Sequence, residues 1–271
     1  MPIKSILCAY SGDAARGSGL RHAVQLAQHH KAHLTGVLRH GISRMEERYY
    51  ARLPSRLKDE LKAADAALIA DVAERFNAVV KSAGLADKAD FVEVDPAADG
   101  PLSAFAYAYD LVVTGMPTAN EREAHLAANP DALALKSGRP VLVVPDSYDA
   151  GGLADRALVA WDGKRSAARA LGDAMEILAE KSNVTLFSVG GEPPGTARMV
   201  DNMRLHGIKV AARTVGRKGS IAKAILAEAE ANDVKLIVMG AFEHSKFAHD
   251  LFGGVTTDVM AQSKVPVFLA H

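Results

Sequence analysis

Short runs of continuously apolar residues alternate along this chain with longer stretches in which apolar residues recur every three or four positions. The segments 183–189 and 234–240 are rich in Val, Ile and Leu and belong to the first kind, and 165–181 belongs to the second. Continuous apolar runs are typical of strands buried on both faces, and the three-and-four spacing is typical of amphipathic helices. The alternation therefore predicts an α/β fold with a doubly wound parallel sheet.

The second part of the chain shows this pattern most regularly, so its elements can be placed one by one. Strands are expected at 156–161, 183–189, 208–214, 234–240 and 265–270. Helices are expected at 165–181, 195–206, 219–232 and 254–263.

The first part of the chain repeats the second. Segment 110–115 parallels 235–240, and segment 138–144 parallels 264–270. The first copy is 26 residues longer between its first and fourth strands, and we assign the additional residues to one long amphipathic helix over 55–83.

The repeat sets the domain boundaries. With 271 residues, the chain has room for two domains of ordinary size. We expect an N-terminal domain at 1–146 and a C-terminal domain at 154–271, joined by a short linker that is rich in turn-forming residues.

The amino-acid composition excludes some classes of binding partner. Basic and acidic residues balance at 32 each, so the basic surplus needed to bind nucleic acid or anionic lipid is missing. No apolar stretch approaches the roughly 20 residues needed to span a bilayer, so no membrane partner is expected. The single cysteine, Cys8, cannot form an internal disulfide and lies in an apolar run. The N-terminus carries no leader-like pattern, so we expect a cytoplasmic protein.

The loops that follow the strands of the second copy carry the candidate chemistry. In an open parallel sheet, ligands bind beyond the carboxyl ends of the strands. Asp162 follows the first strand, Gly240 ends the fourth, and Gly253 and Gly254 precede the last helix. Glycines allow close approach of a ligand, and the first turn of a helix offers N–H groups to phosphate. The residues alone also permit a plain loop in which Thr256 is only a helix cap.

The spacing of these residues resembles the nucleotide loop of the universal stress protein family. That family has Gly, two residues, Gly, nine residues, Gly and then a small hydroxylated residue. Here Gly240 is followed after two residues by Glu243 and, nine residues later, by the segment 253–256. The resemblance covers the whole chain and is sharper in 156–271, where Asp162 stands at the family's first-strand aspartate.

The resemblance has consequences for the architecture. It implies two tandem, doubly wound, five-stranded parallel-sheet domains of the adenine-nucleotide α-hydrolase-like type, related by a pseudo-two-fold axis. The last strands of the two domains, 140–145 and 265–270, are then expected to meet in an antiparallel fashion. The tandem chain would thus form an intramolecular pseudo-dimer, and two such chains could form a homodimer.

The resemblance also implies a ligand and a role. It implies a regulatory stress-response protein that binds an adenine nucleotide, ATP or AMP, with Mg accompanying ATP, in the C-terminal domain. No catalytic residue is expected, because no known catalytic motif is present. The residues expected around the ligand are Ala160, Trp161, Asp162, Val189, Met239, Gly240, Glu243, Gly253, Gly254, Val255 and Thr256. Trp161 could cover an adenine ring or pack in the core.

Two departures from the family pattern leave alternatives open. Glu243 stands where the family has glycine, and Gly254 stands where it prefers Ser or Thr. Glu243 could close the site and leave a nucleotide-free interaction protein, or it could serve as the base of a slow nucleotide hydrolase.

The first copy departs further from the pattern. Ser11 replaces the aspartate, and the sequence Ala128-Asn129-Pro130 replaces the glycine pair and the residue after it. Proline lacks an N–H group, and the larger side chains fill the space that glycine would leave. We therefore expect no nucleotide site of the family type in the first copy.

A histidine cluster lies at the expected end of the first helix. His29 and His33 have the i, i+4 spacing that could hold a metal ion, with His30 between them. No acidic or cysteine residue accompanies them in the segment, so a solvated helix end is favoured and no metal site is expected.

Overall fold

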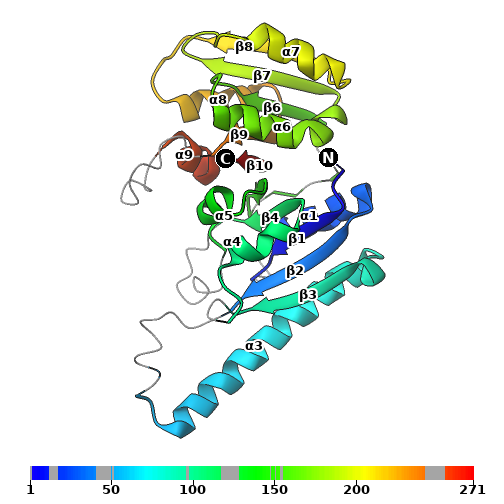
Figure 1. Ribbon diagram of the computed structural model, residues 1–271, viewed down its shortest axis with the longest axis vertical. Coiled ribbons are helices and arrows are strands. Elements are labelled where there is room, and N and C mark those ends of the chain that lie inside the picture. Colours follow the sequence, from blue (N-terminus) through cyan, green and yellow to red (C-terminus); the bar gives the residue numbers. More distant parts are fainter. Residues whose placement is uncertain are drawn as a thin grey trace.

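Ten strands form a single sheet in the computed structural model of the chain (Figure 1). Their order is β3-β2-β1-β4-β5-β10-β9-β6-β7-β8. The structure describes residues 2–11, 18–40, 50, 52–95, 98–116, 128–146, 148–149, 151–152, 155–241 and 254–271.

The first repeat contributes half of this sheet. Its strands are β1 Ser5–Ala9, β2 His33–Arg39, β3 Ala89–Val94, β4 Leu111–Gly115 and β5 Val141–Val144. Its helices are α1 Ser18–His30, α3 Ser55–Ser82, α4 Leu102–Phe105 and α5 Pro130–Lys136. Two short 3₁₀ turns, Ala86–Lys88 and Ala106–Ala108, complete it.

The second repeat supplies the other half. Its strands are β6 Arg156–Ala160, β7 Asn183–Val189, β8 Val210–Val215, β9 Leu236–Gly240 and β10 Val267–Ala270. Its helices are α6 Arg165–Ala179, α7 Thr196–Leu205, α8 Ile221–Ala231 and α9 Val255–Gln262. Every element expected in this repeat is present, and each end lies within two residues of the predicted one.

The two halves have the same strand order and meet as expected. Within each half all strand pairings are parallel. The first strand of each repeat lies between the second and the fourth strand of that repeat. At the junction β5 and β10 pair antiparallel, with Phe268 opposite Leu142. Ten strands therefore behave as two doubly wound five-stranded units joined edge to edge, which confirms the predicted tandem fold.

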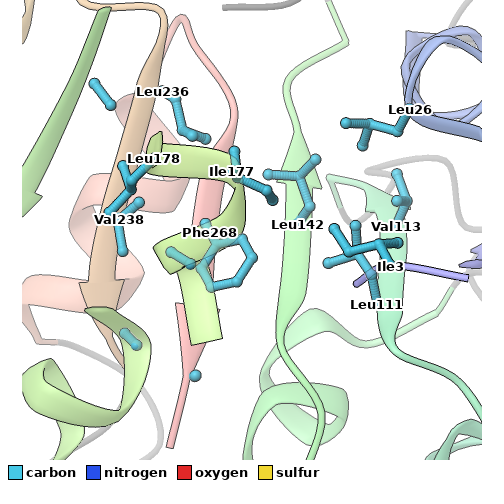
Figure 2. Packing of buried hydrophobic residues seen from close by; sticks show 14 of the residues in the cluster. Ile3, Leu26, Leu111, Val113, Leu142, Ile177, Leu178, Leu236, Val238 and Phe268 are labelled. Carbon is cyan, nitrogen blue, oxygen red and sulfur yellow. The ribbon is translucent and has the colours of Figure 1, made fainter. Parts of the chain in front are cut away.

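Helices cover both faces of the sheet, and each face has a core that continues across the junction. One core packs α1 and α3 beside α6 and α7, and Figure 2 shows part of it with Ile177, Leu142 and Phe268. The other core packs α4 and α5 beside α8 and α9. Cys8 lies in the first core, where burial raises the pKa of its thiol to about 12, so it behaves as a small apolar side chain.

Helix α3 accounts for the extra length of the first repeat, as predicted. It ends where Gly84 adopts φ 71°, and the Leu85 N–H donates to the Val80 carbonyl at 2.9 Å. Only its second half packs on the sheet, through Val72, Phe76 and Val80. The first half extends beyond the sheet (Figure 1). Within the described part of the chain, no helix is both long and apolar enough to cross a bilayer.

Candidate functional site

The strand order of the second repeat reverses between β6 and β9, and we call the carboxyl ends of these two strands the crevice. The chain runs outward from β6 to β7 and β8, and then returns to place β9 on the other side of β6. Helix α6, which follows β6, covers one face of the sheet, whereas α9, which follows β9, covers the other. The helices that follow β6 and β9 thus lie on opposite faces of the sheet, and doubly wound sheets bind ligands at the carboxyl ends of two such strands. Ala160, Asp162 and Gly240 lie at this point.

Gly240 allows α6 to pack closely against the end of β9. A Cβ added at Gly240 would stand 2.6 Å from the Ser166 Oγ and 2.7 Å from the Ala167 backbone nitrogen. The glycine is therefore required by helix packing, whether or not a ligand is present. Ser166 was not among the predicted site residues. Its place in the first turn of the helix that follows β6 is the signal that could have identified it.

No described residue closes the start of α9 on the side of Gly254. Gly254 precedes the helix, and no described heavy atom lies within 4 Å of the position that a Cβ would take there. Val255 is half-buried against the core, and Thr256 is buried with its hydroxyl donating to the Gly240 carbonyl at 3.4 Å. Thr256 thus ties the start of α9 to the end of β9. The first turn of a helix that follows a glycine is a place where anions commonly bind.

Asp162 shapes the loop that leaves β6. Its Oδ1 accepts a hydrogen bond from the Lys164 backbone N–H at 3.0 Å, which closes a tight turn before α6. Gly163 has φ 75°, and a Cβ there would stand 2.7 Å from the Pro193 Cβ. The Asp162 side chain is nevertheless exposed, so it remains accessible to a ligand.

Two of the predicted site residues have side chains that are packed in the cores. The Trp161 indole is 6% exposed and donates from Nε1 to the Thr196 Oγ1 at 3.1 Å. Met239 is buried in the core on the opposite face of the sheet. Ala160 and Val189 are only half-buried at the ends of β6 and β7. Among these four described residues, only the two with smaller side chains remain accessible.

A basic residue adjoins the end of β7. The Gly190 N–H donates to the Val215 carbonyl, and a Cβ at Gly190 would stand 3.7 Å from the Arg217 Cβ. Arg217 is exposed. The predicted site did not include it, although its position directly after the third strand of the repeat could have identified it.

Two predicted site residues, Glu243 and Gly253, lie outside the described residues. The interpretation of Glu243 as a residue that closes the site, or as a base, stays a prediction.

The corresponding place in the first repeat is built differently. Asn129 precedes α5, and its Oδ1 accepts from the Ala132 N–H at 3.0 Å. Pro130 begins the helix and brings no N–H group. Asp131 follows in the first turn, and burial raises the pKa of its carboxyl. This helix start is occupied by the protein's own polar groups.

Comparisons with known proteins agree with the repeat. The universal stress protein family model matches residues 2–145 and 191–271. A universal stress protein of Synechocystis is 26% identical over 170 residues, which cover 59% of this chain and 57% of that protein. The matched part of the chain thus spans little more than half the length of this curated relative.

Solved structures match over the full length. A universal stress protein from Archaeoglobus fulgidus has a TM-score of 0.71 at 19% identity and covers 98% of this chain and 95% of its own. A functionally unknown protein from Pseudomonas aeruginosa has a TM-score of 0.57 at 15% identity and covers 99% and 92%. At these identities the likeness shows the fold alone. Because the family model matches most of both repeats, the chain belongs to the universal stress protein family, as a tandem two-domain member.

Proposed function

We propose that the C-terminal repeat binds an adenine nucleotide in the crevice between β6 and β9, and that the protein acts by binding and regulation in a stress response. The observation that carries this proposal is the start of α9 beside Gly254. No described atom lies within 4 Å of a Cβ position there, and this helix start stands at the switch point of the strand order.

Individual residues can be given roles in this proposal. The exposed carboxylate of Asp162 would accept a hydrogen bond from the adenine or the ribose. Ala160 and Val189 would line the base, and Gly254, Val255 and Thr256 would lie at the phosphates. ATP or AMP would fit these groups, with Mg bound mainly by the phosphates of ATP. The exposed guanidinium of Arg217 could contribute positive charge near the end of β7.

The binding test is calorimetric titration of the full-length protein with ATP, ADP and AMP. We expect one nucleotide per chain. Asp162→Ala should weaken binding roughly 10- to 100-fold, because a hydrogen bond to a charged group contributes about 1.5–3 kcal/mol. Asp173→Asn is the matched control, since that carboxylate pairs with Arg169 on the surface of α6 at 2.8 Å. Two nucleotides per chain, or equal effects of both variants, would contradict the proposed site.

Glu243 determines which form of the proposal holds. Two like charges about 4 Å apart repel by about 1 kcal/mol in water and by more in a partly dry site. Glu243→Gly is therefore expected to strengthen binding of ATP more than binding of AMP, and a phosphate-release assay on the same variant tests catalysis. Turnover that is lost in the variant would instead favour a hydrolase. Binding that appears only in the variant would favour a nucleotide-free interaction protein.

Assembly and location complete the proposal. The antiparallel β5–β10 pairing supplies the intramolecular pseudo-dimer. We further propose that two chains associate as a homodimer, which light scattering on the purified protein tests directly, and that the protein acts in the cytoplasm.

A further inference from the structure

The last turns of α1 and α6 meet at the junction between the two repeats. His29 Nε2 lies 2.8 Å from Glu180 Oε2, and His30 Nδ1 lies 3.8 Å from Glu176 Oε1. The histidines come from the first repeat and the glutamates from the second. One ligating atom from each of His29, His30 and Glu180 lies within 4.8 Å of the others.

The geometry of both helix ends holds these side chains in place. Helix α1 ends at His30, Lys31 adopts φ 53°, and the Ala32 N–H donates to the Ala27 carbonyl at 2.9 Å. The imidazole rings of His29 and His30 are nearly perpendicular, with centroids 4.9 Å apart. On the other side, Glu176 Oε1 also accepts from the Ile3 N–H at 3.2 Å, which ties the N-terminal segment to α6.

The set of donors has the composition of a transition-metal site. Two imidazole nitrogens and carboxylate oxygens suit zinc and its neighbours in the first row far better than calcium or magnesium. Zinc binds histidine nitrogen and carboxylate oxygen at about 2.0–2.2 Å, so ligands of a tetrahedral ion stand about 3.3 Å apart. The separations of 2.8 and 3.8 Å found here bracket this value. A change of about 0.5 Å in each separation would bring both pairs to this value.

The electrostatic surroundings also favour a cation. The four side chains belong to the carboxyl-terminal ends of α1 and α6, and each such end carries a partial negative charge of about half an elementary charge. Glu176 and Glu180 add two formal negative charges. Lys181 and Lys31 are basic residues that adjoin the cluster in the sequence, and they oppose these negative charges.

We propose that His29, His30 and Glu180, with Glu176 as fourth ligand, bind a zinc ion that clamps the two repeats together. The proposal does not depend on nucleotide binding, because α6 separates the two places. Its first turn packs against Gly240 at the nucleotide crevice, and its last turn carries Glu180 after 15 residues, about 22 Å away. The sequence offered no acidic ligand in the histidine segment, and the fold supplies two from the other repeat.

Metal binding can be measured on the untagged full-length protein after removal of metal. Zinc is titrated in competition with a chromophoric chelator, and cobalt(II) is added separately to record the visible absorption of a tetrahedral site. We expect one equivalent of either ion. His29→Ala and Glu180→Gln should each weaken zinc binding at least about 100-fold, since even partners outside the ligand set cost 10- to 100-fold when they are lost.

His33→Ala is the matched control. His33 lies four residues after His29, but its Nε2 lies 2.6 Å from Asp90 Oδ1 on the neighbouring strand, away from the cluster. This variant should bind zinc and cobalt as the unaltered chain does. Loss of binding in His33→Ala would overturn the proposal in favour of the i, i+4 histidine pair.

Thermal melting separates a lost ligand from a damaged fold. Without metal, His29→Ala and Glu180→Gln should melt close to the unaltered chain, because both side chains are exposed. Zinc should raise the melting temperature of the unaltered chain and of His33→Ala only. A chain that binds no zinc, or cluster variants that bind it normally, would show that these contacts are His–Glu pairs without a metal.

Discussion

The last helix of each repeat begins at the same place in the fold and yet presents opposite chemistry. Helix α5 begins with a capping Asn129, a proline and the half-buried carboxyl of Asp131. Helix α9 begins after Gly254, where no described atom lies within 4 Å of a Cβ position. The strand order around the two starts is the same. The two repeats therefore share one frame, and under our proposal only the second receives an anion at this place.

The two repeats also fill the middle of their sheets differently. Cys8 in β1 pairs with Gly36 in β2, and Val159 in β6 pairs with Leu186 in β7. A Cβ at Gly36 would stand 2.4 Å from the Phe76 ring, so the aromatic side chain from α3 occupies the space above this glycine. In the second repeat the strand's own Leu186 is buried at this position. In the first repeat, Phe76 of α3 thus fills the space that a side chain at Gly36 would occupy.

Phe76→Ala gives the largest effect we expect. The ring is fully buried, so the variant should lose about 3–5 kcal/mol of unfolding free energy, measured by chemical denaturation. Leu57→Ala is the control on the same helix, because Leu57 is 41% exposed and should cost under about 0.5 kcal/mol. Similar losses in both variants would mean that α3 does not substitute for the side chain missing at Gly36.

Gly240→Ala and Gly115→Ala test the ends of the equivalent strands β9 and β4. At Gly240 the new methyl group would overlap the backbone of Ser166 and Ala167, and we expect a loss of about 2–3 kcal/mol. At Gly115 no described atom lies within 4 Å of the new Cβ, so the change should be under about 0.5 kcal/mol. Denaturation of the two variants side by side gives the answer. Equal losses would contradict the close packing of α6 on β9.

Much of the fold could be predicted because it depends on local patterns. The continuous apolar runs and the three-and-four spacing predicted every strand and helix of the second repeat, and the offset between the copies predicted α3. The antiparallel junction came from the family resemblance, since a strand such as 141–144 carries no mark of its partner. Element ends such as that of β8, two residues from its predicted start, depend on pairing across the sheet.

The candidate site was less predictable, because contacts between distant segments determine it. The sequence suggested Trp161 as a possible cover for adenine, but its hydrogen bond to Thr196 depends on where α7 packs. The need for glycine at 240 arises from Ser166, 74 positions earlier in the chain. The pairing of His29 with Glu180 crosses from one repeat to the other. None of these contacts leaves a signal in the local spacing.

We expect His22, in the first repeat, to lower the free energy of unfolding as the pH falls. Burial lowers the pKa of this histidine to about 4, helped by the nearby charge of Lys181, and its ring packs edge-on against Tyr148. The folded pKa lies below the unfolded value of 6.5, so the stabilisation is complete above pH 6.5 and is lost as pH falls toward 4. Between pH 7.5 and 5 the loss is about 2 kcal/mol.

The variant His22→Gln isolates this contribution from those of other titrating groups. The slope of unfolding free energy against pH between 5 and 7 should be smaller in the variant than in the unaltered chain. An unchanged slope would show that His22 has the same pKa in the folded and unfolded chains, and so that it is not buried in solution.

Apart from the variants that serve as comparisons, Trp161→Phe is expected to have the smallest effect on the free energy of unfolding. Tyr10 and Trp161 follow the first strands of the two repeats, and both pack on the same core, against Phe76 in one case and beside Thr196 in the other. The variant loses the indole hydrogen bond, which should cost about 1 kcal/mol in denaturation. Nucleotide affinity should change by less than about twofold, under 0.5 kcal/mol. A tenfold loss of affinity with unchanged stability would instead place the indole against the ligand and break the parallel with Tyr10.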